Sequence, residues 1–150
     1  MKPQEISRWI REEHDAVDKL ARELQAQVAM VPRTQIKTWI QETQASLRRF
    51  DEHLVKHFAL EEQDGYLEAV VERRPTLALE VDRLRRQHSE LSRVLGSIRR
   101  DLEPITDVDT LLIEDSCIRI QTMLRFIADH ESRENLIIIS VFTSDLGTKD

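Results

Sequence analysis

The stretch His53-Leu-Val-Lys-His57-Phe-Ala-Leu-Glu61-Glu62 decides how this chain folds. Its two histidines and first glutamate follow one another at spacings of four, so on an α-helix the three side chains lie on one face. An apolar series continues that face toward the N-terminus: Ile36, Ile40, Leu47, Phe50 and Leu54. Imidazoles and a carboxylate are costly to bury without a partner. A metal ion would supply that partner, so the stretch predicts a metal-binding, core-facing helix.

The same helical periodicity runs through the rest of the chain. Apolar residues recur at alternating steps of three and four, which is typical of amphipathic helices. These series occupy four segments: 6–28, 36–61, 77–102 and 113–138. Pro32, Pro75 and Pro104 separate them, because proline interrupts a helix interior. No run alternates with period two between turn residues, so strands have no support. We predict an all-α fold, an up-down-up-down four-helix bundle.

Some helix boundaries have local signals. Thr106 and Asp109 resemble a capping box at the start of the fourth helix. Residues 64–75 are expected to continue the second helix with a kink or break near Gly65, and the chain from Asp145 onward is expected to be a frayed tail.

Composition limits the classes of function. With 150 residues, 33% charged and 40% hydrophobic, the chain is expected to form one domain over residues 1–150. A net charge of −6 gives no basic footprint for nucleic acid. Cys117 is the only cysteine, which excludes an intrachain disulfide and favours the reducing cytoplasm. No apolar run is long enough for a signal peptide or a membrane span, so no membrane partner is expected.

The five histidines follow a pattern. Four of them interrupt an apolar series, one in each segment, and the fifth flanks its series: His14, His57, His88 and His130, with His53 as the fifth. Two of the four have a glutamate four residues later, at Glu61 and Glu134. The chain therefore consists of two similar halves, each a helix with one histidine followed by a helix with His-x-x-x-Glu. A pseudo-twofold bundle would bring both halves to one centre.

This set of side chains suits a pair of metal ions. Imidazole nitrogens bind iron, zinc and copper, while carboxylates can bridge two metals. Four or five histidines exceed what one four-coordinate zinc ion requires. One geometric problem remains, because the two histidines of each half lie at unequal distances from the turn between their helices. Longer turns or tilted helices must absorb this offset.

The chain resembles a hemerythrin-like domain, the HHE cation-binding family, over roughly residues 4 to 142. The matching pieces occur in order: His14, His57-Phe-Ala-Leu-Glu61-Glu62, His88 and His130-Glu-Ser-Arg-Glu134. The resemblance implies a four-helix bundle with a non-haem di-iron centre of two iron ions, for which zinc or manganese can substitute. It also implies that His14 and His57 bind one iron, that His88 and His130 bind the other, and that Glu61 and Glu134 bridge them.

Two positions depart from the oxygen-carrying hemerythrins. Those carriers have a second histidine on the third helix where this chain has Leu84, and they usually have aspartate at the place of Glu134. The missing histidine argues against reversible oxygen carriage specifically. His53 either replaces it as a ligand, which we slightly favour, or orients a ligand from outside the metal's coordination sphere.

Several functions fit these expectations. The chain is expected to bind or sense either a diatomic ligand, such as dioxygen or nitric oxide, or an oxidant. A homodimer is one assembly that the sequence allows. The alternative is a di-iron enzyme or repair protein that handles peroxide or nitric oxide, or supplies iron to damaged iron–sulfur centres. A third hypothesis is a purely structural bundle. Among nearby side chains, Tyr66 is expected to pack at a helix end, with a hydrogen-bond donor or redox-active phenol near the mouth of the site as the alternative. Glu13 is expected to be solvated, and Glu62 to face solvent or the outer side of a ligand.

Overall fold

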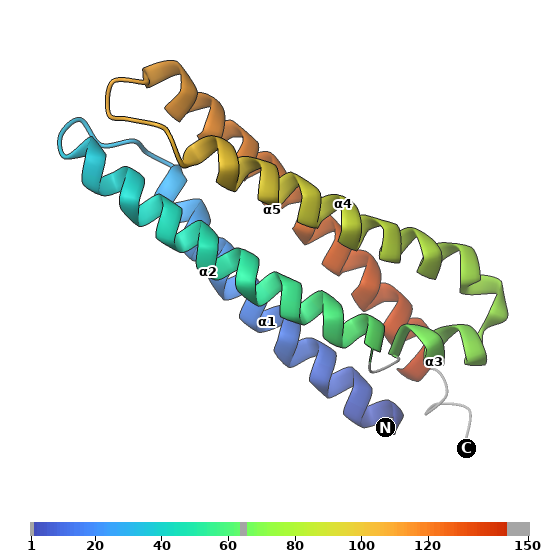
Figure 1. The fold of residues 1–150 in the computed structure, drawn as a ribbon. Helices are drawn as coiled ribbons and strands as arrows, with labels where there is room; N and C mark the ends of the chain where they lie inside the picture. The colour runs from blue at the N-terminus through green and yellow to red at the C-terminus, as the bar shows by residue number, and fades with distance from the viewer. Residues whose placement is uncertain (1, 64–65, 144–150) are drawn as a thin grey trace.

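The computed structural model describes residues 2–63 and 66–143, and within them all regular structure is helical. Four long helices are joined by shorter helical pieces: α1 (Pro3–Val28), α2 (Ile36–Gln63), α3 (Tyr66–Arg73), the 3-10 turn η1 (Pro75–Leu77), α4 (Ala78–Leu102), α5 (Thr110–Ile138) and the π-helical turn η2 (Ile139–Thr143). Figure 1 shows α1, α2, α4 and α5 running alternately up and down the bundle. Contacts join α1 to α2 and α5, and α4 to the same two helices, which confirms the predicted four-helix bundle.

The buried side chains form two apolar clusters. The larger cluster occupies the end of the bundle near the two long connections and includes Val17, Leu47, Leu91, Leu95, Ile120 and Ile127. The smaller cluster lies around α3 and includes Ile10, Tyr66, Leu67, Val70, Leu84, Ile138 and Phe142. On α1, α4 and α5 a histidine lies in sequence between the members of one cluster and those of the other. The candidate ligands therefore separate two hydrophobic cores.

The connections 29–35 and 103–109 resolve the offset between the paired histidines. His14 lies nearer to the end of α1 than His57 lies to the start of α2, and the second half has the same imbalance. Figure 1 shows that both connections run along the bundle axis, so that α2 and α5 begin beyond the ends of α1 and α4. The long connections therefore bring the paired histidines to the same level of the bundle. Longer turns were one of the two predicted ways to absorb the offset.

The start of α5 differs from the prediction. Asp109 Oδ2 accepts hydrogen bonds from the backbone N–H (2.8 Å) and the hydroxyl (3.1 Å) of Thr106, so the expected contact forms. The helix nevertheless begins at Thr110, because Asp109 N–H bonds to Thr106 O and closes a turn before it. Thr106 is therefore not the N-cap, and the predicted helix start was too early.

Two other boundary predictions fall on residues outside the described part. The expected break near Gly65 and the expected tail from Asp145 both lie there. On the C-terminal side of the first gap, residues 66–73 form helix α3. In the part of the chain that the structure describes, no helix has the length and apolarity needed to cross a membrane.

Candidate metal centre

Six of the seven predicted ligands meet in the middle of the bundle. They come from all four long helices and are at most 3% exposed: His14, His57, Glu61, His88, His130 and Glu134. They form two overlapping groups, and within each group one ligand atom from every residue lies within 4.8 Å of the others. One group contains His14 and His57, the other contains His88 and His130, and both contain Glu61 and Glu134. The structure therefore brings the two sequence halves to one centre.

The helical spacing of four produces the contact within each half. His130 Nε2 lies 2.9 Å from Glu134 Oε1, and His57 Nε2 contacts Glu61 Oε1 in the same way. Residues four apart are neighbours on a helix surface, so each His-x-x-x-Glu unit presents a nitrogen and an oxygen together. This part of the centre follows directly from the sequence.

The two carboxylates also reach across the bundle. Glu61 Oε1 faces His57 and lies 3.7 Å from His14 Nε2, while Glu61 Oε2 lies 2.9 Å from His88 Nε2. Glu134 Oε1 lies 2.9 Å from His130 Nε2 and 3.6 Å from His14 Nε2. Each glutamate thus contacts histidines of both halves. Glu61 uses a different oxygen for each half, so it belongs to both ligand groups.

Every histidine of the centre has an oxygen atom at its outer nitrogen. His14 Nδ1 lies 2.7 Å from Asn135 Oδ1, and His130 Nδ1 lies 2.7 Å from Gln87 Oε1. The other two Nδ1 atoms face carboxylates: His57 faces Glu13 at 3.3 Å, and His88 faces Glu62 at 3.2 Å. An oxygen at Nδ1 favours the tautomer with the proton on Nδ1, which leaves Nε2 free to bind a metal. This arrangement would suit all four imidazoles to bind a metal ion through Nε2.

These outer partners were largely missed from the sequence. Glu13 is partly solvated, as expected, with 25% of its side chain exposed, and it also contacts His57, which was not expected. Glu62 contacts His88, in agreement with one of its two expected roles. The sequence did contain a signal for these outer partners. Each one directly adjoins a candidate ligand in the sequence, but its side chain contacts a histidine on another helix. The pairs in sequence are Glu13–His14, Glu61–Glu62, Gln87–His88 and Glu134–Asn135.

Charge pairing holds the centre together without metal. Burial alone would lower the pKa of His14, but the neighbouring Glu134 and Glu61 outweigh it and raise that pKa to about 11. Burial is likewise outweighed at His57 and His88, where Glu61 raises the pKa. The pKa of Glu61 is well below its usual range, because its contacts with Glu134 and with three histidines outweigh burial. Metal binding to these histidines must therefore release protons.

Unpaired buried atoms show that the side chains fit metal ions. Despite these close charge contacts, six buried side-chain nitrogen or oxygen atoms among the described residues make no hydrogen bond, and four belong to the centre: His14 Nε2, His57 Nε2, Glu61 Oε1 and Glu134 Oε1. Unpaired buried polar atoms are rare and require an explanation. These four lie together, and each offers a lone pair to a cation once the imidazoles lose a proton, so the residues present fit bound metal.

His53 is the predicted ligand that stays apart. The two ligand groups found in the described part of the chain do not include it. His53 is half-buried on α2, and its Nε2 is buried without a hydrogen-bond partner among the described residues. Leu84, at the position where carriers have a histidine, is 2% exposed and packs in the smaller cluster.

Tyr66 enters the centre from α3. Its hydroxyl donates a hydrogen bond to Glu134 Oε2 and lies 3.5 Å from Glu61 Oε2. Its ring packs in the smaller cluster, as expected for a helix-end residue. The side chain therefore combines the expected helix-end packing with the alternative role of a hydrogen-bond donor to the centre.

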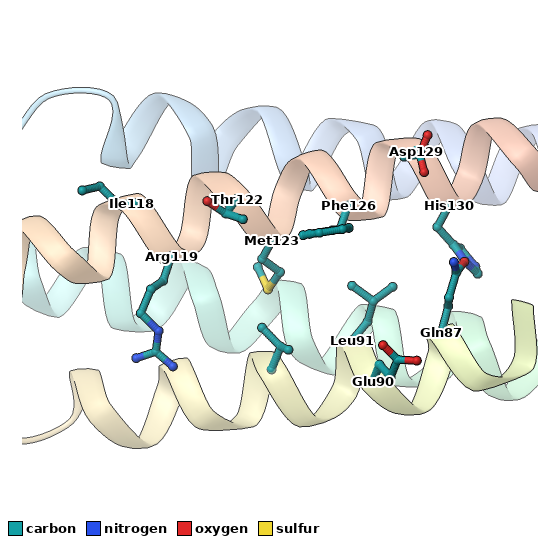
Figure 2. Close-up of a pocket in the computed structure, with 11 residues that line it drawn as sticks. Gln87, Glu90, Leu91, Ile118, Arg119, Thr122, Met123, Phe126, Asp129 and His130 are labelled. Carbon is teal, nitrogen blue, oxygen red and sulfur yellow. The ribbon is translucent and has the colours of Figure 1, made fainter. Parts of the chain in front are cut away.

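A groove between α4 and α5 reaches the outer edge of the centre. It has a volume of about 410 Å³, and its walls include Leu91, Met123 and Phe126. Figure 2 shows Gln87 lying beside His130 at one end and Arg119 at the other. The groove therefore meets the centre at the hydrogen bond between Gln87 and His130, on the side of the imidazole that faces away from the other ligands.

Comparison with known proteins agrees with this geometry. A family model described as the hemerythrin HHE cation binding domain matches residues 5–142, nearly the whole chain. No curated protein and no solved structure matches the chain. The match includes all six residues of the centre. With its four-helix bundle and its buried histidines and glutamates, the chain belongs to the hemerythrin HHE cation-binding domain family.

Proposed function

We propose that this chain is a non-haem di-iron protein that binds or senses dioxygen, nitric oxide or a related small oxidant. The observation that carries the proposal is the pair of ligand groups that share Glu61 and Glu134. In this proposal one iron is held by His14 and His57, and the other by His88 and His130. The shared carboxylates lie between them and offset their positive charge.

The donor set suits iron and explains possible substitutes. Mixed imidazole and carboxylate ligands bind iron, and they also accept zinc or manganese when those metals are more available. Bound iron supplies reversible one-electron chemistry toward a small oxidant. The protein fixes the imidazoles through their outer oxygens and surrounds them with apolar side chains. Phe58, for example, stacks on His88 with ring centroids 4.1 Å apart. Such packing limits water at the centre.

One observation favours the alternative of a turnover or repair function. Leu84 places a buried apolar side chain where oxygen carriers have a histidine, so one iron has fewer protein ligands. An open position on a metal suits a site that exchanges ligands during turnover. A di-iron enzyme acting on peroxide or nitric oxide, or a protein that supplies iron to damaged iron–sulfur centres, is therefore the second candidate.

Anaerobic loading with ferrous iron tests the proposal. We expect elemental analysis to approach two iron ions per chain, and the optical spectrum of the reduced protein to change on addition of dioxygen or nitric oxide. A long-lived adduct supports binding or sensing, while rapid consumption of the oxidant without an adduct supports the enzymatic alternative. A chain that folds normally and takes up no iron would leave only a structural role.

A further inference from the structure

Tyr66 is held in place from several sides. It is 4% exposed and lies in the smaller cluster with Val70 of its own helix and Leu84 of α4. The Trp9 ring of α1 packs against it with centroids 6.4 Å apart. A buried tyrosine usually directs its hydroxyl to a partner. Here the partners are the two carboxylates of the candidate metal centre, so a fixed ring delivers a fixed hydrogen-bond donor.

The hydroxyl treats the two carboxylates unequally. Both carboxylate oxygens of Glu61 face histidines. The Tyr66 hydroxyl lies 3.5 Å from Glu61 Oε2, which is farther than its distance from Glu134 Oε2. Glu134 uses only Oε1 toward histidines, while its Oε2 accepts the hydrogen bond of Tyr66. The hydroxyl is therefore hydrogen-bonded to the oxygen of Glu134 that makes none of these histidine contacts.

We infer that Tyr66 is a positioning residue of the centre, whose hydroxyl fixes Glu134 so that Oε1 faces the histidines of both halves. Tyr66 of α3 and Leu84 of α4 lie in the same apolar cluster beside the centre. Of these two side chains, Tyr66 supplies a polar group to the centre and Leu84 supplies none. The part of the inference that concerns metal affinity rests on the proposed function. The hydrogen bond between Tyr66 and Glu134 exists without metal and is testable alone.

A double-mutant cycle in the metal-free protein tests the hydrogen bond. Tyr66→Phe removes the hydroxyl, and Glu134→Met removes the acceptor at similar length. If the two groups interact, Tyr66→Phe lowers the melting temperature in the wild-type background and changes it much less beside Glu134→Met. Additive shifts would overturn the inference, whatever the protein does with metal.

Titration with cobalt(II), whose visible spectrum reports ligand geometry, tests the positioning role. We expect Tyr66→Phe to weaken binding of at least one cobalt ion by about 10–100-fold and to alter the spectrum. Val71→Ala is the matched control, because Val71 lies on the same helix and packs against the same cluster. It should lower the melting temperature while leaving cobalt affinity and spectrum unchanged.

Two outcomes of the metal experiments would overturn the inference. One is unchanged cobalt affinity and spectrum in Tyr66→Phe. The other is a visible charge-transfer band in the ferric protein that disappears in Tyr66→Phe, because the phenolate would then be a direct ligand. If the wild-type chain itself fails to bind two cobalt ions, the proposed function fails, and the melting cycle still decides the role of the hydroxyl.

Discussion

The two halves of the bundle, α1–α2 and α4–α5, contribute matching ligands in different surroundings. Each half supplies one histidine and one His-x-x-x-Glu unit. In each half, one histidine contacts an amide oxygen and the other contacts a carboxylate. In the first half His14 contacts Asn135 and His57 contacts Glu13. In the second half His130 contacts Gln87 and His88 contacts Glu62. The halves differ in the segment after each unit. Tyr66, on the helix after α2, bonds to the glutamate of the other half, and α5 continues into a π-helical turn without a comparable donor among the described residues.

The two halves also differ in the residue that directly follows the histidine of each His-x-x-x-Glu unit, His57 or His130. In the first half this residue is Phe58, which stacks on His88. In the second half it is Glu131, a carboxyl group that is 4% exposed and whose Oε1 has no hydrogen-bond partner in the described part of the chain. The comparison teaches that a repeated ligand pattern does not make the two candidate metal positions equivalent. Their neighbours differ in polarity, so the two ions should differ in affinity.

The largest expected effect comes from a ligand that both halves share. Glu61→Ala removes an oxygen from each ligand group and should reduce iron content from two ions per chain toward zero. His130→Ala removes a ligand from the second group alone and should spare the first ion. Elemental analysis of both variants, with exposed Glu12→Ala as the control, measures this difference. Equal losses in the two variants would contradict the separation into two groups.

Metal should stabilise the whole bundle, because both halves meet at the centre. Binding to the folded state alone adds about 2.7 kcal/mol to the free energy of unfolding at a metal concentration of 100 Kd, and about 4.1 kcal/mol at 1,000 Kd. Thermal melts of metal-free and iron-loaded protein measure this stabilisation. Coincident melts at saturating metal would mean that the centre does not form as the structure shows.

Replacing the outer amides should weaken the halves one at a time. Asn135→Ala frees Nδ1 of His14, and Gln87→Ala frees Nδ1 of His130. Each change should lower the affinity of the ion on its own side by about 10–100-fold while both ions still bind at saturation. Stepwise titration with cobalt(II) separates the two affinities. If both variants weaken the same ion, the assignment of histidines to the two positions is wrong.

Glu131 should make the metal-free protein less stable at higher pH. Burial is the main reason that its pKa rises from 4.5 to about 9, against the opposing charge of His14. The folded state then keeps a proton that the unfolded state loses between these values, so this contribution to stability falls as the pH rises through that window. We expect Glu131→Gln to remove this fall and to stabilise the protein by about 1–3 kcal/mol at pH 8.

Chemical unfolding at pH 4 and pH 8 measures the contribution of Glu131. The two proteins should be close in stability at pH 4, where the glutamate is protonated in both states. Exposed Glu114→Gln, on the same helix, is the control and should show no comparable gain at pH 8. A Glu131→Gln variant that is equally or less stable than the wild type at pH 8 would contradict the prediction.

The smallest expected effect is that of His53→Ala. Because His53 lies outside both ligand groups, we expect two iron ions per chain to remain, with a smaller change in affinity than the outer amide variants produce. Iron content and the optical spectrum decide the point. Loss of one ion, together with a changed spectrum, would instead make His53 the direct ligand that replaces the histidine absent at Leu84.

The sequence predicted the bundle and the six central residues because both depend on local geometry. A step of three or four residues places side chains on one helix face whatever the rest of the chain does. The spacing between His57 and Glu61, and its repeat at His130 and Glu134, therefore specified two nitrogen–oxygen pairs in advance. Burial of these pairs results from the apolar residues around them in each series.

The tertiary structure decided how the pairs meet and which side chains surround them. The rotation and level of each helix depend on packing and on the connections 29–35 and 103–109, which no local spacing encodes. Only this packing places Glu13 against His57 and Asn135 against His14, since each contact joins two helices. The same packing brings Tyr66 to Glu134 and leaves His53 to one side, although His53 lies one helical turn from His57.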